Sequence, residues 1–252
     1  MKLSLLIAGI AAAAATASAA QAGITVTYEA PGATNTTAGF DVVGVETFDT
    51  RSSGGFATDF GGNGVISGVY SSAIQVYPAD QYGGQGGSNY AVTFSEAGYS
   101  LSLTSTQNAS GVTYFGYYLP ALDGGNLLEL YSGANKIFSF SQSTVLAAVG
   151  GNPAYLGKPD QPYQGQNSGQ PYVFVNFFAT GDTTFDRVVF RESPTVGGYE
   201  SDNHTVGYYK DITGTPVSGV PEPATWAMMI IGFGGVGAMV RRGRGARAAR
   251  FA

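Results

Sequence analysis

Short apolar stretches alternate with glycine, serine, asparagine and proline along most of the chain, from residue 23 to residue 212. The stretches are rich in valine, isoleucine, tyrosine, phenylalanine and threonine, which suit a pleated, half-buried strand. This pattern predicts eleven strands, near residues 24–28, 41–48, 65–77, 90–94, 99–105, 112–119, 127–131, 136–141, 172–179, 185–192 and 205–210. The stretch 136–141 alternates apolar and polar positions, as a strand with one buried face should.

A single helix is predicted, over residues 143–149, where the apolar pattern stops at Gly150-Gly151. Two polar loops are long enough to suggest a functional role: the glycine-rich segment 79–89, and residues 152–171 with four prolines. Many short strands at this spacing favour an all-β domain over 23–212, a two-sheet antiparallel sandwich of jelly-roll type. A closed barrel is the alternative. Residues 213–220 are predicted to be a linker.

The amino-terminal end has the pattern of a secretory signal peptide. Lys2 precedes an apolar run from Leu3 to Ala15, and the small-residue pairs Ala17-x-Ala19 and Ala20-x-Ala22 follow. Such pairs are typical of signal peptidase cleavage sites. We predict that residues 1–22 are removed by a cut after Ala22, with a cut after Ala19 as the alternative.

The carboxyl-terminal end has the pattern of a membrane segment. Residues 224–240 carry no charge, and as a helix they would span about 25 Å, close to the thickness of a hydrocarbon core. Trp226 stands where an interfacial aromatic is expected, and Arg241 and Arg242 open a basic tail over 241–252. Positive residues remain cytoplasmic. The pattern therefore predicts one transmembrane helix, with the rest of the protein outside the cytoplasm.

The residues just before this helix resemble a known sorting signal. Pro221-Glu222-Pro223, with Trp226-Ala227 after it, is similar to the PEPxxWA form of the PEP-CTERM signal, here spanning the motif 221–229 and the whole segment 221–252. The resemblance implies that an inner-membrane precursor is recognised by an exosortase, loses its tail, and passes to the cell surface or extracellular matrix. It also implies an association with exopolysaccharide or biofilm layers.

Several internal stretches resemble the ectodomains of PEP-CTERM proteins. They are residues 88–94, 113–118, 127–131 and 185–190, together with Glu200-Ser201-Asp202-Asn203. This second resemblance implies a secreted β-sandwich and names no activity.

The segment 23–220 is strongly acidic. Of the 12 basic and 17 acidic residues in the chain, it holds 6 and 16, because Lys2, five tail arginines and Glu222 lie outside it. Nucleic-acid binding requires a basic face and is excluded. The chain has no cysteine, which excludes disulfides, thiolate catalysis and cysteine-based zinc sites.

Acidic and amide side chains near two predicted strands suggest a calcium site. Glu46 and Asp49 close an early strand, and Asp202 and Asn203 precede the last one. Calcium prefers such oxygen ligands, and an ion here could join the first and last strands. The alternative is that these residues simply occupy turns, which aspartate and asparagine favour.

Tyrosines in the two long loops suggest glycan binding. Tyr82 and Tyr163 stand among glycine, glutamine and asparagine, where exposed rings could stack on sugar faces. Tyrosine is also an ordinary strand residue with a polar end. His204 is the only histidine, and no Gly-x-Ser-x-Gly motif accompanies it. We therefore expect a loop or strand-edge histidine with no special role, and no enzymatic activity.

The combined features predict an exported surface or matrix protein with a structural or adhesive role. A carbohydrate-binding, lectin-like module is the alternative, and a polysaccharide hydrolase comes third. A hydrolase would need two facing carboxyl groups, which Glu46, Asp49, Glu200 and Asp202 could supply in several combinations.

Overall fold

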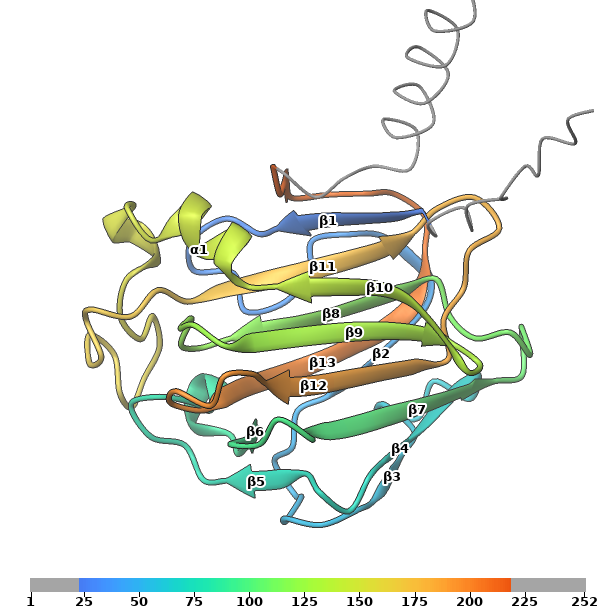
Figure 1. Ribbon diagram of the computed structural model, residues 1–252, viewed down its shortest axis with the longest axis horizontal. Coiled ribbons are helices and arrows are strands. Elements are labelled where there is room, and N and C mark those ends of the chain that lie inside the picture. The colour runs from blue at the N-terminus through green and yellow to red at the C-terminus, as the bar shows by residue number, and fades with distance from the viewer. Residues whose placement is uncertain (1–22, 219–252) are drawn as a thin grey trace, which may run out of the picture.

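The computed structural model describes residues 23–218. Their strands form two antiparallel sheets that pack face to face (Figure 1). The predicted two-sheet antiparallel sandwich is therefore confirmed. The signal peptide with Ala20 and Ala22, and the sorting segment 221–252 with its predicted helix, lie outside the described residues. Among the helices between residues 23 and 218, none is long and apolar enough to span a bilayer.

The larger sheet has eight strands. Its order is β14 (Thr215–Pro216), β1 (Ile24–Tyr28), β11 (Val173–Ala179), β8 (Tyr114–Leu119), β13 (Tyr199–Tyr209), β6 (Tyr90–Thr93) and β5 (Gln75–Tyr77), and β2 (Phe40–Glu46) also pairs with β13. The long strand β13 thus has β8 on one side, and β6 and β2 in succession on the other.

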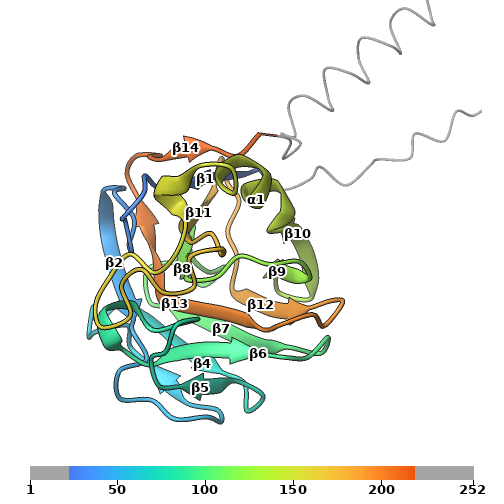
Figure 2. The same ribbon diagram turned by 90° about the vertical axis from the view of Figure 1, so that its left-hand side faces the viewer.

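The smaller sheet has six strands. Its order is β10 (Asn135–Ser141), β9 (Asn126–Ser132), β12 (Arg187–Glu192), β7 (Tyr99–Ser105), β4 (Ile66–Tyr70) and β3 (Ala57–Thr58). Figure 2 shows the two layers from one end, with β2 and β10 on opposite sides of the domain.

Most predicted elements are present, with two informative differences. The strands β1 and β7 and the helix α1 (Ser143–Val149) have the predicted bounds. The predicted strand 65–77 divides into β4 and β5, which lie in different sheets, because the chain turns where the Ile74 amide donates to the Ser71 carbonyl at 3.2 Å. Strand β14 pairs with β1, so the large sheet extends into residues 213–220, which were predicted to be a linker.

The main core lies between the sheets. Phe115 and Phe177 of the large sheet meet Phe190 and Phe140 of the small one, with Phe115 and Phe190 ring centroids 6.0 Å apart and those of Phe140 and Phe177 5.1 Å apart. The helix α1 contributes Val145 and Val149 to the same core.

The outer face of the large sheet is also covered. Every residue of β8 and β11 is buried, and Tyr118, Tyr172 and Phe174 form a second apolar cluster. Strands buried on both faces read as continuous apolar runs, which explains their sequences YFGYYL and VFVNFFA. The cover comes in part from the two long loops, which contain the short 3-10 helices Gln85–Gly87 and Pro153–Tyr155. Residues 29–37 add to it, since the Gly32 amide donates to the Tyr172 hydroxyl and Glu29 accepts from Asn176.

Lys158 joins these two loops. Its Nζ atom donates to the carbonyl oxygens of Gly83 and Gly84 at 2.8 and 2.6 Å, and Asp160 accepts a hydrogen bond from the Gly86 amide. The side chain is buried, and this burial lowers the pKa of Lys158. Both loops predicted to be functional therefore form one layer over the large sheet.

A β-bulge in β13 decides which side chains enter the core. Its register with β8 shifts between Asp202 and Thr205, and Asn203 has a φ of 48°. An extra residue at a bulge reverses the alternation of side chains along the strand. Ser201 and His204 therefore face the same core, although they are three residues apart.

Candidate functional site

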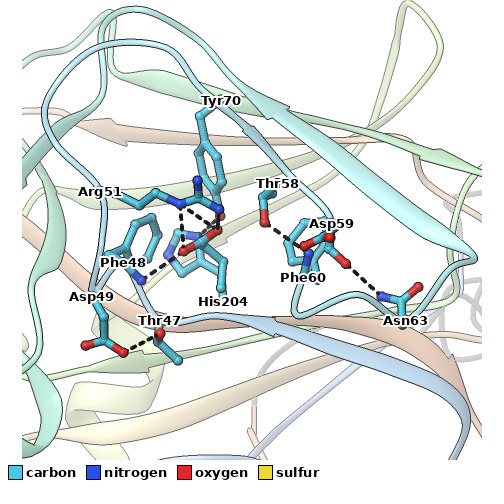
Figure 3. A network of polar contacts seen from close by, with 11 residues as sticks. Thr47, Phe48, Asp49, Arg51, Thr58, Asp59, Phe60, Asn63, Tyr70 and His204 are labelled. Atoms are coloured by element: carbon cyan, nitrogen blue, oxygen red, sulfur yellow. Dashed lines mark hydrogen bonds and ion pairs between the residues drawn. The ribbon is translucent and has the colours of Figure 1, made fainter.

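His204 lies in the centre of the core. Its Nδ1 atom is 2.9 Å from the Tyr70 hydroxyl, and its Nε2 atom is 3.0 Å from Ser201 Oγ. The ring stacks on Phe190 at a centroid distance of 4.9 Å. Figure 3 shows Tyr70 and His204 directed toward each other beside Arg51. The expectation of a loop or strand-edge histidine is wrong, because the bulge turns this residue inward.

The surroundings of His204 are those of a structural group. Ser201 Oγ also lies 3.0 Å from the Tyr99 hydroxyl, so Tyr70, His204, Ser201 and Tyr99 form a continuous chain that we call the histidine network. All four residues are buried. Burial lowers the pKa of His204 to about 3, which keeps the imidazole neutral at physiological pH.

The four residues predicted to bind calcium are close in the fold, but their side chains diverge. Glu46 is opposite His204 in the β2–β13 register, and its carboxylate accepts from Arg51 Nη2 at 2.8 Å and from the Phe48 amide at 3.0 Å. Asp202 Oδ2 turns to the glycine-rich loop and accepts from the Gln85 amide at 2.8 Å.

The other two of the four share a small pocket. Asp49 and Asn203 line it together with Thr47 and residues 85–88, around a volume of about 340 Å³. Asp49 accepts from the Thr47 hydroxyl at 2.7 Å, as Figure 3 shows, and Asn203 Nδ2 donates to the Thr34 carbonyl at 2.8 Å. Within residues 23–218, no three histidine, cysteine, aspartate or glutamate side chains are arranged to hold a metal ion.

A second and larger pocket lies where the glycine-rich loop meets β5, β6 and the start of β13. We call it the aromatic pocket; its volume is about 500 Å³. Its lining residues are Tyr77, Asp80, Tyr82, Tyr90, Phe94, Ala121, Asp123, Gln170, Val196, Gly197 and Glu200. The pocket combines exposed rings with carboxyl and amide groups.

The rim of the aromatic pocket is apolar and exposed. Tyr77, Tyr82, Phe94 and Val196 are 38%, 46%, 44% and 60% exposed. The Tyr77 ring is 6.1 Å from Phe94 and 6.3 Å from Tyr90, measured between centroids. These contacts place Tyr77 of β5, Tyr90 of β6 and Phe94, which follows β6, on one wall.

Asp80 positions Tyr82 in this pocket. Asp80 Oδ1 accepts from the amides of Tyr82 and Gly83 at 2.7 and 3.0 Å, and Oδ2 accepts from the Tyr90 hydroxyl at 3.2 Å. An aspartate that accepts from amides two and three residues ahead stabilises a tight turn. The loop thus holds Tyr82 at the rim while the ring itself stays exposed.

Two carboxyl groups of the pocket, those of Glu200 and Asp123, have raised pKa values. Burial, followed by the charges of Asp123 and Asp80, raises the pKa of Glu200 to about 7. Burial, followed by the charge of Glu192, raises the pKa of Asp123 to about 6. Perturbed carboxyl groups in a pocket are typical of functional sites.

Of the two tyrosines predicted to bind glycan, the pocket lining includes only Tyr82. Tyr163 is half-buried in the loop 152–171, where its carbonyl accepts from the Gln166 amide at 3.0 Å. Glu200, expected only as a possible hydrolase carboxylate, also lines the pocket, as do Tyr77 and Phe94. The spacing of Tyr77, Asp80 and Tyr82 around a turn could have indicated Tyr77, whereas Glu200 is distant along the chain.

Comparison with known proteins identifies one segment. Residues 219–244 match the family model described as the PEP-CTERM protein-sorting motif. No curated protein matches the chain significantly, and no solved structure does. The matched segment contains the predicted signal residues Pro221, Glu222, Pro223, Trp226 and Ala227, with Arg241 and Arg242. The motif implies export, a membrane-anchored precursor and exosortase-dependent processing, so the chain carries the sorting signal of a PEP-CTERM surface protein.

Proposed function

We propose that this protein is an exosortase-sorted component of the cell surface or matrix, and that its sandwich binds polysaccharide in the aromatic pocket. The sorting motif supports the destination. The exposed aromatic rim supports the binding activity. The association with exopolysaccharide and biofilm follows from the resemblance of the tail to PEP-CTERM signals.

One observation carries the binding proposal. Seven large hydrophobic side chains are exposed among residues 23–218, and four of them, Tyr77, Tyr82, Phe94 and Val196, line the aromatic pocket. Single exposed apolar residues are ordinary on a protein surface, but a group around a concave site indicates an interaction. The pocket is therefore the best-supported ligand site on the described surface.

The chemistry of the pocket suits a sugar. Tyrosine and phenylalanine offer flat apolar faces, and a sugar ring has matching apolar C–H faces for such contacts. Gln170 and Glu200 add polar groups that can orient hydroxyls, as in other small-molecule sites. Since the segment 23–220 holds 16 acidic and 6 basic residues, electrostatics favour an uncharged polysaccharide over a polyanionic one.

The proposal assigns binding without hydrolysis. Glycoside hydrolysis places two carboxyl groups on opposite sides of the scissile bond. Asp123 and Glu200 both line this pocket, so they are a pair of carboxyl groups that a hydrolase could use. Release of new reducing ends from the producing organism's exopolysaccharide, lost in Glu200→Gln, would contradict a purely binding role.

Co-sedimentation with exopolysaccharide purified from the producing organism tests the binding proposal. We expect saturable binding that Tyr82→Ala weakens about tenfold or more, since an aromatic side chain central to an interface commonly contributes over 1 kcal/mol. Tyr163→Ala is the matched control, because it removes a loop tyrosine outside the pocket lining. Equal binding by both variants, or no saturable binding by the native domain, would overturn the proposal.

A separate experiment tests the sorting route. Deletion of residues 221–252 should release the domain in soluble form, and Glu222→Ala should leave an unprocessed, membrane-bound precursor. Immunoblotting of membrane, surface and medium fractions distinguishes these products. A mature surface protein that retains the whole tail would contradict exosortase processing.

A further inference from the structure

Three oxygen-bearing side chains gather at one end of the small sheet, next to the aromatic pocket. Asn126 begins β9 and Glu192 ends β12, and the two are direct partners in the register of these strands. Asp123 precedes β9 and also lines the aromatic pocket. We call these residues the carboxylate cluster.

The segment that carries Asp123 packs against the end of β12, where the Ser193 amide donates to the Gly125 carbonyl at 2.7 Å. The amides of Val196 and Gly197 donate to Glu192 Oε1 at 2.6 and 2.7 Å. A Cβ atom at Gly197 would stand 2.7 Å from Asp123 Oδ2, so the Asp123 carboxylate lies directly against this loop. The loop 193–198 therefore contacts both carboxylates at once.

The cluster holds oxygens that the protein itself does not satisfy. Seven buried side-chain polar atoms lack a hydrogen-bond partner within residues 23–218, and three of them are Asp123 Oδ1, Asn126 Oδ1 and Glu192 Oε2. Asn126 and Glu192 are each 1% exposed. Buried polar groups in native proteins are nearly always paired, so three unpaired acceptors in contacting segments point to a missing positive partner.

The orientation of Asn126 supports this reading. Its Nδ2 atom donates to Gln142 Oε1 at 3.1 Å, and Gln142 Nε2 donates to the Tyr117 hydroxyl at 3.4 Å. In this orientation the unpaired Asn126 atom is the carbonyl oxygen. The four ion pairs of the described residues involve Glu46, Glu129 and Asp41, and none involves a member of the cluster.

We propose that the carboxylate cluster binds a calcium ion through Asp123, Asn126 and Glu192. Two carboxylates and one amide oxygen are hard ligands of the kind calcium prefers, and they include no nitrogen or sulfur donor of the kind that favours zinc. Calcium takes six to eight oxygens in flexible geometry, which suits ligands from two strand ends and a loop. Water and backbone carbonyls would complete the shell.

The ion would tie β9, β12 and the segment that carries Asp123 together, and Glu192 would link it to the loop 193–198 through the amides of Val196 and Gly197. Val196 and Gly197 of that loop form part of the aromatic pocket, so calcium would also stiffen one wall of the proposed polysaccharide site. The calcium proposal is independent of polysaccharide binding, because calcium binding is measured without any glycan present.

Thermal unfolding of the full chain in detergent micelles tests the proposal, with calcium chloride or EGTA added. At 10 mM calcium, about 100 times a dissociation constant of ~10⁻⁴ M, the midpoint should rise by about 5 °C or more over EGTA. We expect Asp123→Asn to lower calcium affinity at least tenfold, measured by titrating the midpoint and by equilibrium dialysis. Glu192→Gln should do the same if it folds.

Asp49→Asn is the matched control. It removes one carboxylate from the smaller pocket that contains Asn203, and it should leave the calcium shift unchanged. In EGTA, Asp123→Asn should be at least as stable as the native chain, whereas in calcium the order should reverse. A native midpoint that calcium does not change, or a calcium shift that survives Asp123→Asn, would overturn the proposal.

Discussion

The histidine network and the carboxylate cluster are two polar groups at the same sandwich interface, and they differ in one respect. In the network, the hydroxyls of Tyr70, Tyr99 and Ser201 and both nitrogens of His204 are paired. In the cluster, each of the three side chains retains an unpaired oxygen. The network is neutral, whereas the cluster contains two carboxylates.

This difference separates a structural role from a ligand-binding one. A buried polar network whose members are all satisfied stabilises a unique arrangement of strands. Buried carboxylates without partners destabilise the folded state unless a cation or a proton joins them. Burial alone therefore does not identify a site; the balance of donors and acceptors does.

Removal of the central side chain of the network should have the largest effect. We expect His204→Ala to lower the free energy of unfolding of residues 23–218 by about 3–5 kcal/mol, because it leaves a cavity beside Phe190, leaves the Tyr70 hydroxyl unpaired and removes one of the two partners of Ser201. Urea unfolding measures the change. The loss should be the same in calcium and in EGTA, and a calcium-dependent loss would break the distinction between the two groups.

Acid should weaken the network through the same residue. The pKa of His204 is about 3 in the folded protein and 6.5 when unfolded, so only the unfolded state takes up a proton between these values. Stability is therefore complete above pH 6.5 and declines by about 1.4 kcal/mol per pH unit as the pH falls toward 3. Urea unfolding of the native domain and His204→Gln from pH 7 to 4 isolates this slope, and parallel curves would contradict it.

Loss of one hydroxyl should have a smaller effect. Tyr70→Phe keeps the ring but leaves His204 Nδ1 unpaired in the core, and we expect a loss of about 1–3 kcal/mol in the free energy of unfolding. Tyr82→Phe is a suitable control, because that tyrosine is exposed at the rim. A Tyr70→Phe domain as stable as the native one would show that the network contributes little.

Neutralising the cluster should change stability least, and in the opposite direction. In EGTA at pH 8, Asp123 is ionised although its folded pKa is about 6, so its charge is unfavourable in the folded state. After allowance for its partial exposure, we expect Asp123→Asn to increase the free energy of unfolding by about 1 kcal/mol. A loss as large as that of His204→Ala would instead assign the cluster a structural role.

Local patterns in the sequence predicted most of the fold. The elements 24–28, 99–105 and 143–149 have the predicted bounds. Their bounds depend on neighbouring residues alone, namely on the apolar pattern and on the glycines that end it. The stretch 65–77 was predicted as one strand, since its apolar character continues through the turn at Ser71 that sends β5 to the other sheet. The short strand β3 and the strand β14 carry too few residues for a pattern to form.

The candidate sites were predicted less completely. Tyr82 was selected from its loop and does line the aromatic pocket, but Glu200 and Phe94 join it only through the pairing of β13 and β6. His204 was expected outside the core. The one-residue bulge beside it interrupts the alternation of side chains along the strand, so the alternation pattern in the sequence cannot predict which way His204 points. The carboxylate cluster had no local signal, since Asn126 and Glu192 meet only through the β9–β12 register.

The sequence by itself determined the sorting signal, the acidic and cysteine-free character of the domain, and its all-β class. Each of these depends on composition or on contiguous residues. The tertiary structure decided which face of β13 enters the core, which rings share a pocket and which oxygens remain unpaired. These features depend on strand register and loop packing, which bring residues such as Tyr70 and His204, 134 positions apart in the sequence, within hydrogen-bond distance.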